Sequence, residues 1–222
     1  TALELGDRLG VSLALWVLAE IRNAYGNFLE ADALISRAIF LGRALDLNYE
    51  LCDSLCCAGE VYLKSGQLAL AQTTLTEAEQ LATDPDQLLK VKLLAARVRQ
   101  MVTGNEEQPL SELEQLLEKY PALANRAAIY YDIWRLSEKQ NKTAAVVAAD
   151  LYQQLYREIP NLEYKHRYEN ITGEQLGQPP ELPPLPAIIR DYTIKLGVLL
   201  PQVDALIQEI KLEAEAGVER TA

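Results

Sequence analysis

Several residue types on which catalysis and metal binding depend are scarce in this sequence. The 222 residues include one histidine, His166, and one methionine. A Ser-His-Asp triad or a site with several histidine ligands therefore has a single histidine to draw on. The sequence contains no Walker A, Gly-x-Ser-x-Gly or dinucleotide-binding motif. We therefore expect a protein that is not an enzyme and that binds no cofactor.

The three cysteines, Cys52, Cys56 and Cys57, lie within about two helical turns. This spacing is poorly suited to a disulfide, and the number is odd. Cys52 and Cys56 are one turn apart and could share a metal ion, but no histidine or fourth thiol lies nearby to complete a structural zinc site. We interpret all three as buried thiols in a reducing compartment, and we expect a cytoplasmic protein without a metal site.

Long apolar runs are also missing. No run reaches the roughly 18 residues that span a bilayer, and Pro201 follows the apolar stretch at 196–200. We therefore expect no membrane insertion. The start of the sequence shows no signal-peptide pattern. Residues 1–7 instead resemble the end of a helix, so we interpret the sequence as a fragment of a longer protein.

Positive charge is outweighed by negative charge. Lys and Arg number 21 against 32 Asp and Glu, which gives a net charge of −11. Phosphate backbones repel such a protein, so nucleic acid is a poor partner. Basic side chains gather at residues 165–167 and on one predicted helix, at Lys90, Lys92, Arg97 and Arg99. We interpret both groups as solvent-exposed helix faces.

Leucine and alanine dominate the composition, which is 49% hydrophobic, and apolar residues recur at helical spacing. Asp84 followed by Pro85 is typical of a helix start. Ser111 and Glu114 form a capping pattern that predicts another start. The predicted helices span about 9–25, 28–45, 49–64, 68–82, 85–102, 111–120, 122–139, 143–158, 161–168, 187–199 and 202–215.

A repeat with a period of 40 residues runs through the first part of the sequence. Small residues in amphipathic stretches recur at this spacing, where Gly26, Ala31 and Ala38 are followed by Gly66, Ala71 and Ala78. Small residues at one spacing allow paired helices to approach closely. The repeat therefore predicts stacked helical hairpins, each of which needs neighbours to bury its apolar face.

The second repeat unit resembles the tetratricopeptide repeat family. Its large, small and aromatic positions match in order at Leu55, Gly59, Tyr62, Gly66, Ala71, Leu75 and Ala78. The first unit matches except at Arg22, where the family has tyrosine. The period exceeds the family's usual length of about 34 residues and is similar to the long repeats of multidomain signalling proteins. The resemblance covers residues 1–105 well and 106–158 loosely.

The resemblance implies an all-α fold, a right-handed superhelix of antiparallel helix pairs. We expect this array over 1–172, followed by a connector with five prolines at 173–186. A helical pair at 187–222 is expected to cap the last hairpin, since solenoids need their terminal faces covered.

In this family the first helix of each pair lines a concave groove. The matching positions here are Trp16, Glu20, Asn23, Asp53 and Glu60. Such an acidic groove would suit a protein or peptide segment that is basic or amphipathic. The resemblance implies no chaperone-type carboxylate clamp, because Glu20 and Glu60 stand where clamps carry Lys, Asn or Arg. Alternatively, the two glutamates are solvated or pair with Arg22 or Lys64.

Three functions are compatible with these features. The one we favour is a non-catalytic protein–protein interaction scaffold, the repeat region of a larger regulatory or signalling protein. The groove would bind a partner segment or another domain of the same chain. The alternative is a module that senses a peptide or small effector and controls an attached catalytic domain. A hydrolase that depends on His166 is the third.

Overall fold

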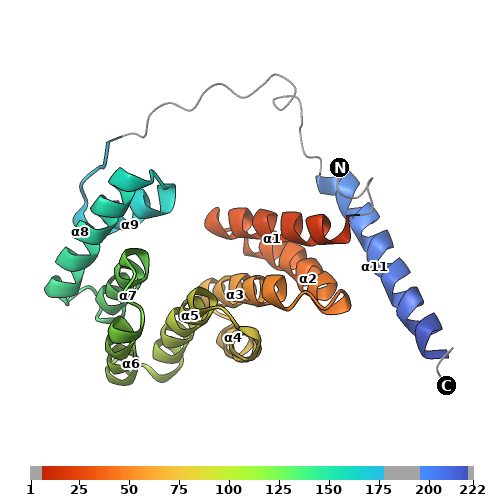
Figure 1. Ribbon diagram of the computed structural model, residues 1–222, viewed down its shortest axis with the longest axis horizontal. Coiled ribbons are helices and arrows are strands. Elements are labelled where there is room, and N and C mark those ends of the chain that lie inside the picture. The colour runs from red at the N-terminus through yellow and green to blue at the C-terminus, as the bar shows by residue number, and fades with distance from the viewer. Residues whose placement is uncertain (1–6, 178–195, 220–222) are drawn as a thin grey trace. The chain divides into compact units, whose positions relative to one another are not determined.

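The computed structural model describes residues 7–177 and 196–219, and these residues contain helices and no strands. The predicted all-α class is confirmed for this part of the chain. Contacts divide the molecule into two compact units, residues 1–83 with 183–222 and residues 84–182. Within each unit, helices that follow one another in sequence pack side by side (Figure 1). This sequential packing is the pattern of an α-solenoid.

The first unit begins with two hairpins of antiparallel helices. The pairs are α1 (Arg8–Ala24) with α2 (Phe28–Ala44), and α3 (Asn48–Lys64) with α4 (Leu68–Leu81). These bounds agree with the predicted helices to within one residue at each end. The turn inside each hairpin contains a glycine with positive φ, Gly26 at 75° and Gly66 at 79°. Only glycine adopts this conformation without strain, so the repeated glycine fixes where each hairpin turns.

The 40-residue period also appears in buried hydrogen bonds. Ser12 Oγ donates to the carbonyl oxygen of Ala38 at 3.3 Å, and Cys52 Sγ donates to that of Ala78 at 3.4 Å. Both bonds join the first helix of a hairpin to its own second helix, with the same separation in sequence. The two hairpins therefore share one packing geometry even where serine is replaced by cysteine.

The small repeat positions lie where helices are in contact. Ala31, Ala38, Ala71 and Ala78 are fully buried. A Cβ added at Gly59 of α3 would lie 2.7 Å from Leu75 Cδ2 of α4. A larger side chain at this position would have to displace the buried Leu75 side chain or the helix that carries it.

The C-terminal helix α11 (Leu196–Glu219) is one helix that continues through Pro201. The predicted break between two helices at Pro201 is therefore wrong. An exposed proline removes one helical hydrogen bond, and burial of Val203, Ile207 and Ile210 on one face of α11 offsets this loss. The predicted helix over 187–199 lies largely outside the described residues, as does most of the proline-rich segment.

The helix α11 packs against the first hairpin, not the last one as predicted. Figure 1 shows α11 beside α1 and α2, and its three buried apolar residues join the core to which these helices contribute. Arg37 donates two hydrogen bonds to Asp204, at 2.7 and 3.0 Å. Arg8 donates two to Glu213, at 3.0 and 3.1 Å. These ion pairs add complementary charge to the apolar contacts that hold α11 on this hairpin.

Acid should weaken the docking of α11 on the hairpin. Hydrogen bonds from Arg37 and Arg8 lower the pKa of Asp204 and of Glu213 below their ordinary values of 3.8 and 4.5. The ion pairs therefore stabilise the docked helix above those values, and this contribution is lost as the pH falls through the lower, folded values. We expect hydrogen-exchange protection of residues 199–213 to fall below about pH 4. The double variant Asp204→Asn/Glu213→Gln should show reduced protection already at neutral pH, and an unchanged profile in that variant would contradict the role of these pairs.

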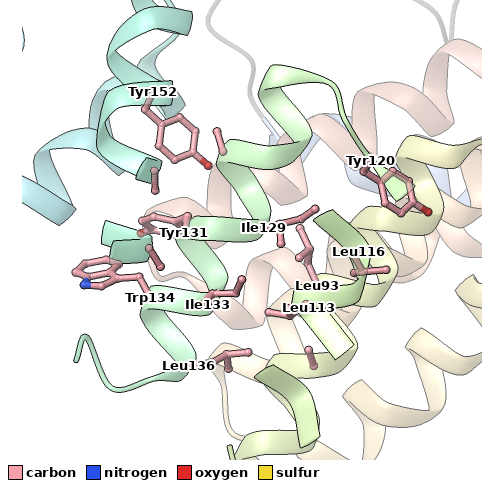
Figure 2. Close-up of a cluster of buried hydrophobic side chains, with 14 of the residues drawn as sticks. Leu93, Leu113, Leu116, Tyr120, Ile129, Tyr131, Ile133, Trp134, Leu136 and Tyr152 are labelled. Atoms are coloured by element: carbon pink, nitrogen blue, oxygen red, sulfur yellow. The ribbon is translucent and has the colours of Figure 1, made fainter. Parts of the chain in front are cut away.

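The second unit contains α5 (Pro85–Thr103), α6 (Glu107–Lys119), α7 (Leu123–Leu136), α8 (Lys142–Glu158) and α9 (Leu162–Thr172). Its core is rich in aromatic side chains. Figure 2 shows Tyr131 and Trp134 on α7 close to Tyr152 of α8, with Leu93 and Leu113 among the other buried residues.

Three helices of this unit differ from prediction by more than one residue, and one of them, α7, ends at Leu136 instead of 139. Helix α6 begins four residues before Ser111, so the predicted capping role of Ser111 is wrong. Asn105 Oδ1 instead accepts a hydrogen bond from the backbone N–H of Glu107, at 2.9 Å. Pro109 is tolerated because the first-turn N–H groups of a helix lack intrahelical partners. Helix α9 continues to Thr172 and ends at Gly173, which has a φ of 73°.

Candidate functional site

The five residues predicted to line the groove lie on α1 and α3 of the first unit. We call this surface the α1–α3 face; it comprises Trp16, Glu20, Asn23, Asp53 and Glu60. Four of them are half-buried, and Asn23 is only 5% exposed. The structure brings Asn23 and Glu60 together across the two helices, with Asn23 Nδ2 3.4 Å from Glu60 Oε2. Two helices that do not follow each other in sequence thus share a polar surface.

The alternative prediction for Glu60 is confirmed, because its Oε1 lies 3.2 Å from Lys64 Nζ. Arg22 pairs with Glu30 instead, at 2.9 Å. The pair with Lys64 is half-exposed, and such pairs contribute little to stability. Glu60 therefore remains a carboxylate at an accessible surface.

Asn23 has an unusual environment on this face. Its Oδ1 atom is buried and accepts no hydrogen bond from any residue that the structure describes. A buried acceptor without a donor costs about 1–3 kcal/mol, because it has lost its water. Because this oxygen is buried, a ligand N–H group would recover that free energy only by drawing the Asn23 side chain toward the surface.

A second polar cluster, in the second unit, joins alternate helices and was not predicted. Arg97 of α5 donates to both carboxylate oxygens of Asp132 on α7, at 2.9 and 2.7 Å. The side chain of Arg97 is 13% exposed, and that of Asp132 is fully buried. The interpretation of the basic helix as a solvent-exposed face is wrong for Arg97. The same interpretation is wrong for Lys165, which is 9% exposed.

Aromatic rings hold a further arginine of this cluster. The Arg167 guanidinium lies 5.2 Å from the ring centroid of Tyr131 and 5.6 Å from that of Tyr152. It also donates to Tyr152 Oη at 2.6 Å. Burial raises the pKa of Tyr152 to about 12, although Arg167 opposes this shift, so the phenol stays protonated at neutral pH. Asn170 Nδ2 donates to Tyr131 Oη, at 2.6 Å.

One signal in the sequence pointed to Arg97. When Gly104 is aligned with Gly66, Arg97 falls at the position of Gly59, where the repeat pattern requires a small residue. A charged side chain there needs a buried partner of opposite charge, and Asp132 follows 35 residues later on the next-but-one helix.

A cleft of about 720 Å³ lies between α11 and the first hairpin. Three of its side chains are cationic, but two of these are already paired: Arg8 with Glu213, and Arg43 with Glu77, at 2.7 Å. Its lining consists of Arg8, Phe40, Arg43, Ala44, Ile210, Lys211 and Glu213. The cleft therefore presents no strong charge of one sign to a ligand.

The cysteines form part of the packing of α3. Cys52, Cys56 and Cys57 are buried thiols, as interpreted from their spacing. Among the residues that the structure describes, no group of three or more His, Cys, Asp or Glu side chains is placed to hold a metal ion. None of the described helices is long and apolar enough to cross a bilayer.

Comparisons of this chain with protein-family models, with curated proteins and with solved structures found no match. The geometry of the two units is therefore what bears on function.

Proposed function

We propose that this chain is a non-catalytic protein–protein interaction scaffold that binds a partner segment on the α1–α3 face. The observation that carries the proposal is the buried Oδ1 of Asn23, which accepts no hydrogen bond from the described residues. An extended or helical segment laid across α1 and α3 would draw the Asn23 side chain toward the surface and donate a hydrogen bond to this oxygen. Asparagine at such a position is suited to reading a peptide group, because it both donates and accepts.

The charges of the face indicate the chemistry of the partner. Glu20, Asp53 and Glu60 are carboxylates on or near this surface, and Trp16 provides an aromatic side chain beside them. A segment with Lys or Arg next to apolar residues complements that combination. The partner we propose is therefore a basic or amphipathic protein segment.

The proposal extends the resemblance to tetratricopeptide repeats. Paired helices with one repeated packing geometry give a rigid support, and the polar positions of the first helices are left for recognition. A cytoplasmic regulatory or signalling protein is the setting we propose, in which this region holds a partner or another domain of the same chain.

A peptide selection tests this function. Displayed random peptides are selected on the purified 222-residue chain, and a synthetic copy of an enriched peptide is titrated calorimetrically. We expect enriched peptides to carry Lys or Arg, and the variant Glu20→Gln/Glu60→Gln to bind about tenfold more weakly, which corresponds to about 1.4 kcal/mol.

The matched control is Glu114→Gln/Glu118→Gln, which removes the same charge from two exposed positions on α6. It should bind like the parent chain. Equal weakening by both double variants would show that only net charge matters, and the α1–α3 face would then not be the site.

A further inference from the structure

The cluster in the second unit contains another arginine, Arg135 on α7, that forms no close hydrogen bond with the buried carboxylate of Asp132. Both oxygens of Asp132 accept close hydrogen bonds from Arg97. Arg135, also on α7, reaches the same carboxylate only at 3.9 Å, between Nη1 and Oδ1. Within the part of the chain that the structure describes, Arg135 donates no hydrogen bond. Its guanidinium thus has five N–H donors available.

The surroundings of Arg135 make its positive charge costly. Burial lowers its pKa, and the charge of Arg97 lowers it further, while Asp132 opposes these effects. Arg167, which is itself paired with Glu163, makes a smaller contribution to the same repulsion. Three guanidinium groups from α5, α7 and α9 therefore act on one small region, and an added anion beside Arg135 would relieve the repulsion.

Arg135 is accessible and is held by an aromatic ring. Its side chain is 42% exposed, so a ligand can approach it from solvent. The guanidinium lies 5.7 Å from the ring centroid of Tyr131. That ring is itself fixed, since it packs edge-on against Tyr152 at 6.0 Å and lies 5.6 Å from Trp134 (Figure 2). Such support reduces the entropy that the arginine loses when it binds.

We propose that Arg135, with Arg97 and Arg167 beside it, forms a binding site for an oxyanion, the carboxylate or phosphate group of an acidic ligand. Guanidinium forks bind both groups with paired, charge-assisted hydrogen bonds. The bidentate pair between Arg97 and Asp132 shows this geometry inside the same cluster. The site selects charge opposite to that proposed for partners of the α1–α3 face, and it stands independently of that function.

Titration of the full chain with two simple probes tests the site. Inorganic phosphate and glutarate are added separately at constant ionic strength, and the side-chain Nε–H signals of arginine are followed by NMR. The Arg135 signal is assigned as the one that Arg135→Gln removes. We expect it to shift and to saturate with at least one probe. Saturation with phosphate alone would indicate a phosphoryl ligand, and saturation with glutarate alone would indicate a carboxylate ligand. Either result supports the site.

Three variants complete the test. The affinity of each variant for the probe is measured from the change in the Trp134 indole NMR signal. Arg135→Gln should weaken binding at least tenfold, and Arg135→Lys should retain part of it. The control Arg157→Gln removes one positive charge from an exposed position on α8 and should bind normally. A linear response without saturation, or equal weakening by Arg157→Gln, would overturn the proposal.

Discussion

Replacement of Asp132 by alanine should lower the free energy of unfolding of the second unit by about 3–5 kcal/mol. Asp132 is fully buried, and Arg97 beside it is 13% exposed. Without the carboxylate, the guanidinium would be left as a buried charge whose principal partner is gone. Removal of one member of a buried ion pair costs far more than the pair itself contributes, because desolvation of the remaining charge is no longer compensated.

The effect can be measured by urea unfolding with Trp134 as the fluorescent reporter. The chain has two tryptophans, so a Trp16→Phe background leaves only the one in the second unit. Asp132→Leu/Arg97→Met, which removes both charges and keeps apolar volume, should recover most of the loss. Glu112→Ala, which breaks the half-exposed pair with Arg99, should cost at most about 1 kcal/mol. A similarly small loss for Asp132→Ala would contradict the importance of the buried pair.

Leucine in place of Ala71 should destabilise the first unit by about 1–3 kcal/mol or more. Ala71 of α4 is fully buried, and Gly59 and Leu75 show how closely α3 and α4 approach in this hairpin. Three additional carbon atoms have no space there unless the helices separate. The expected loss is therefore one of packing between helices, since leucine is itself a good helix former.

The matched control is Ala69→Leu, an exposed position on the same helix. The two variants make the same chemical change two residues apart, and thermal unfolding followed by circular dichroism compares them. Ala69→Leu should leave the midpoint nearly unchanged. Equal midpoints for both variants would mean that the repeat register places the wrong face of α4 against α3.

The first four helices were predictable because their signals are local. The turn glycines Gly26 and Gly66, and small residues at helical spacing, specify a hairpin within about 40 residues of sequence. The start of α6 was harder, because the serine capping pattern at Ser111 predicted a later start, whereas the N-cap is Glu106, which makes no side-chain cap hydrogen bond. The first helical N–H, of Glu107, donates to Asn105 Oδ1, one residue before the N-cap.

The position of α11 could not be predicted from local patterns. Its buried stripe is an ordinary amphipathic face that would suit several hairpins. On the first hairpin this stripe is joined by ion pairs of Arg37 and Arg8, which lie 167 and 205 residues before their acidic partners. Sequence alone gives no measure of which distant charges meet, so the first hairpin was not distinguished from the last.

The candidate site, too, was predictable from the sequence only in part. The helix positions of the α1–α3 face follow from the repeat register, but the buried Oδ1 of Asn23 depends on how α1 and α3 pack. The cluster around Asp132 was missed because its charged members come from three helices. Its one sequence signal, Arg97 at a small-residue position, became informative only together with a buried carboxylate.

The central claim is that a partner segment binds the α1–α3 face, and NMR of the two tryptophan indoles tests it most directly. Trp16 belongs to this face, and Trp134 lies in the core of the second unit. Addition of a selected basic peptide to the full chain should shift the indole N–H signal of Trp16 with saturation and leave that of Trp134 in place. A saturable shift of Trp134 alone, or binding with no change at Trp16, would contradict the account.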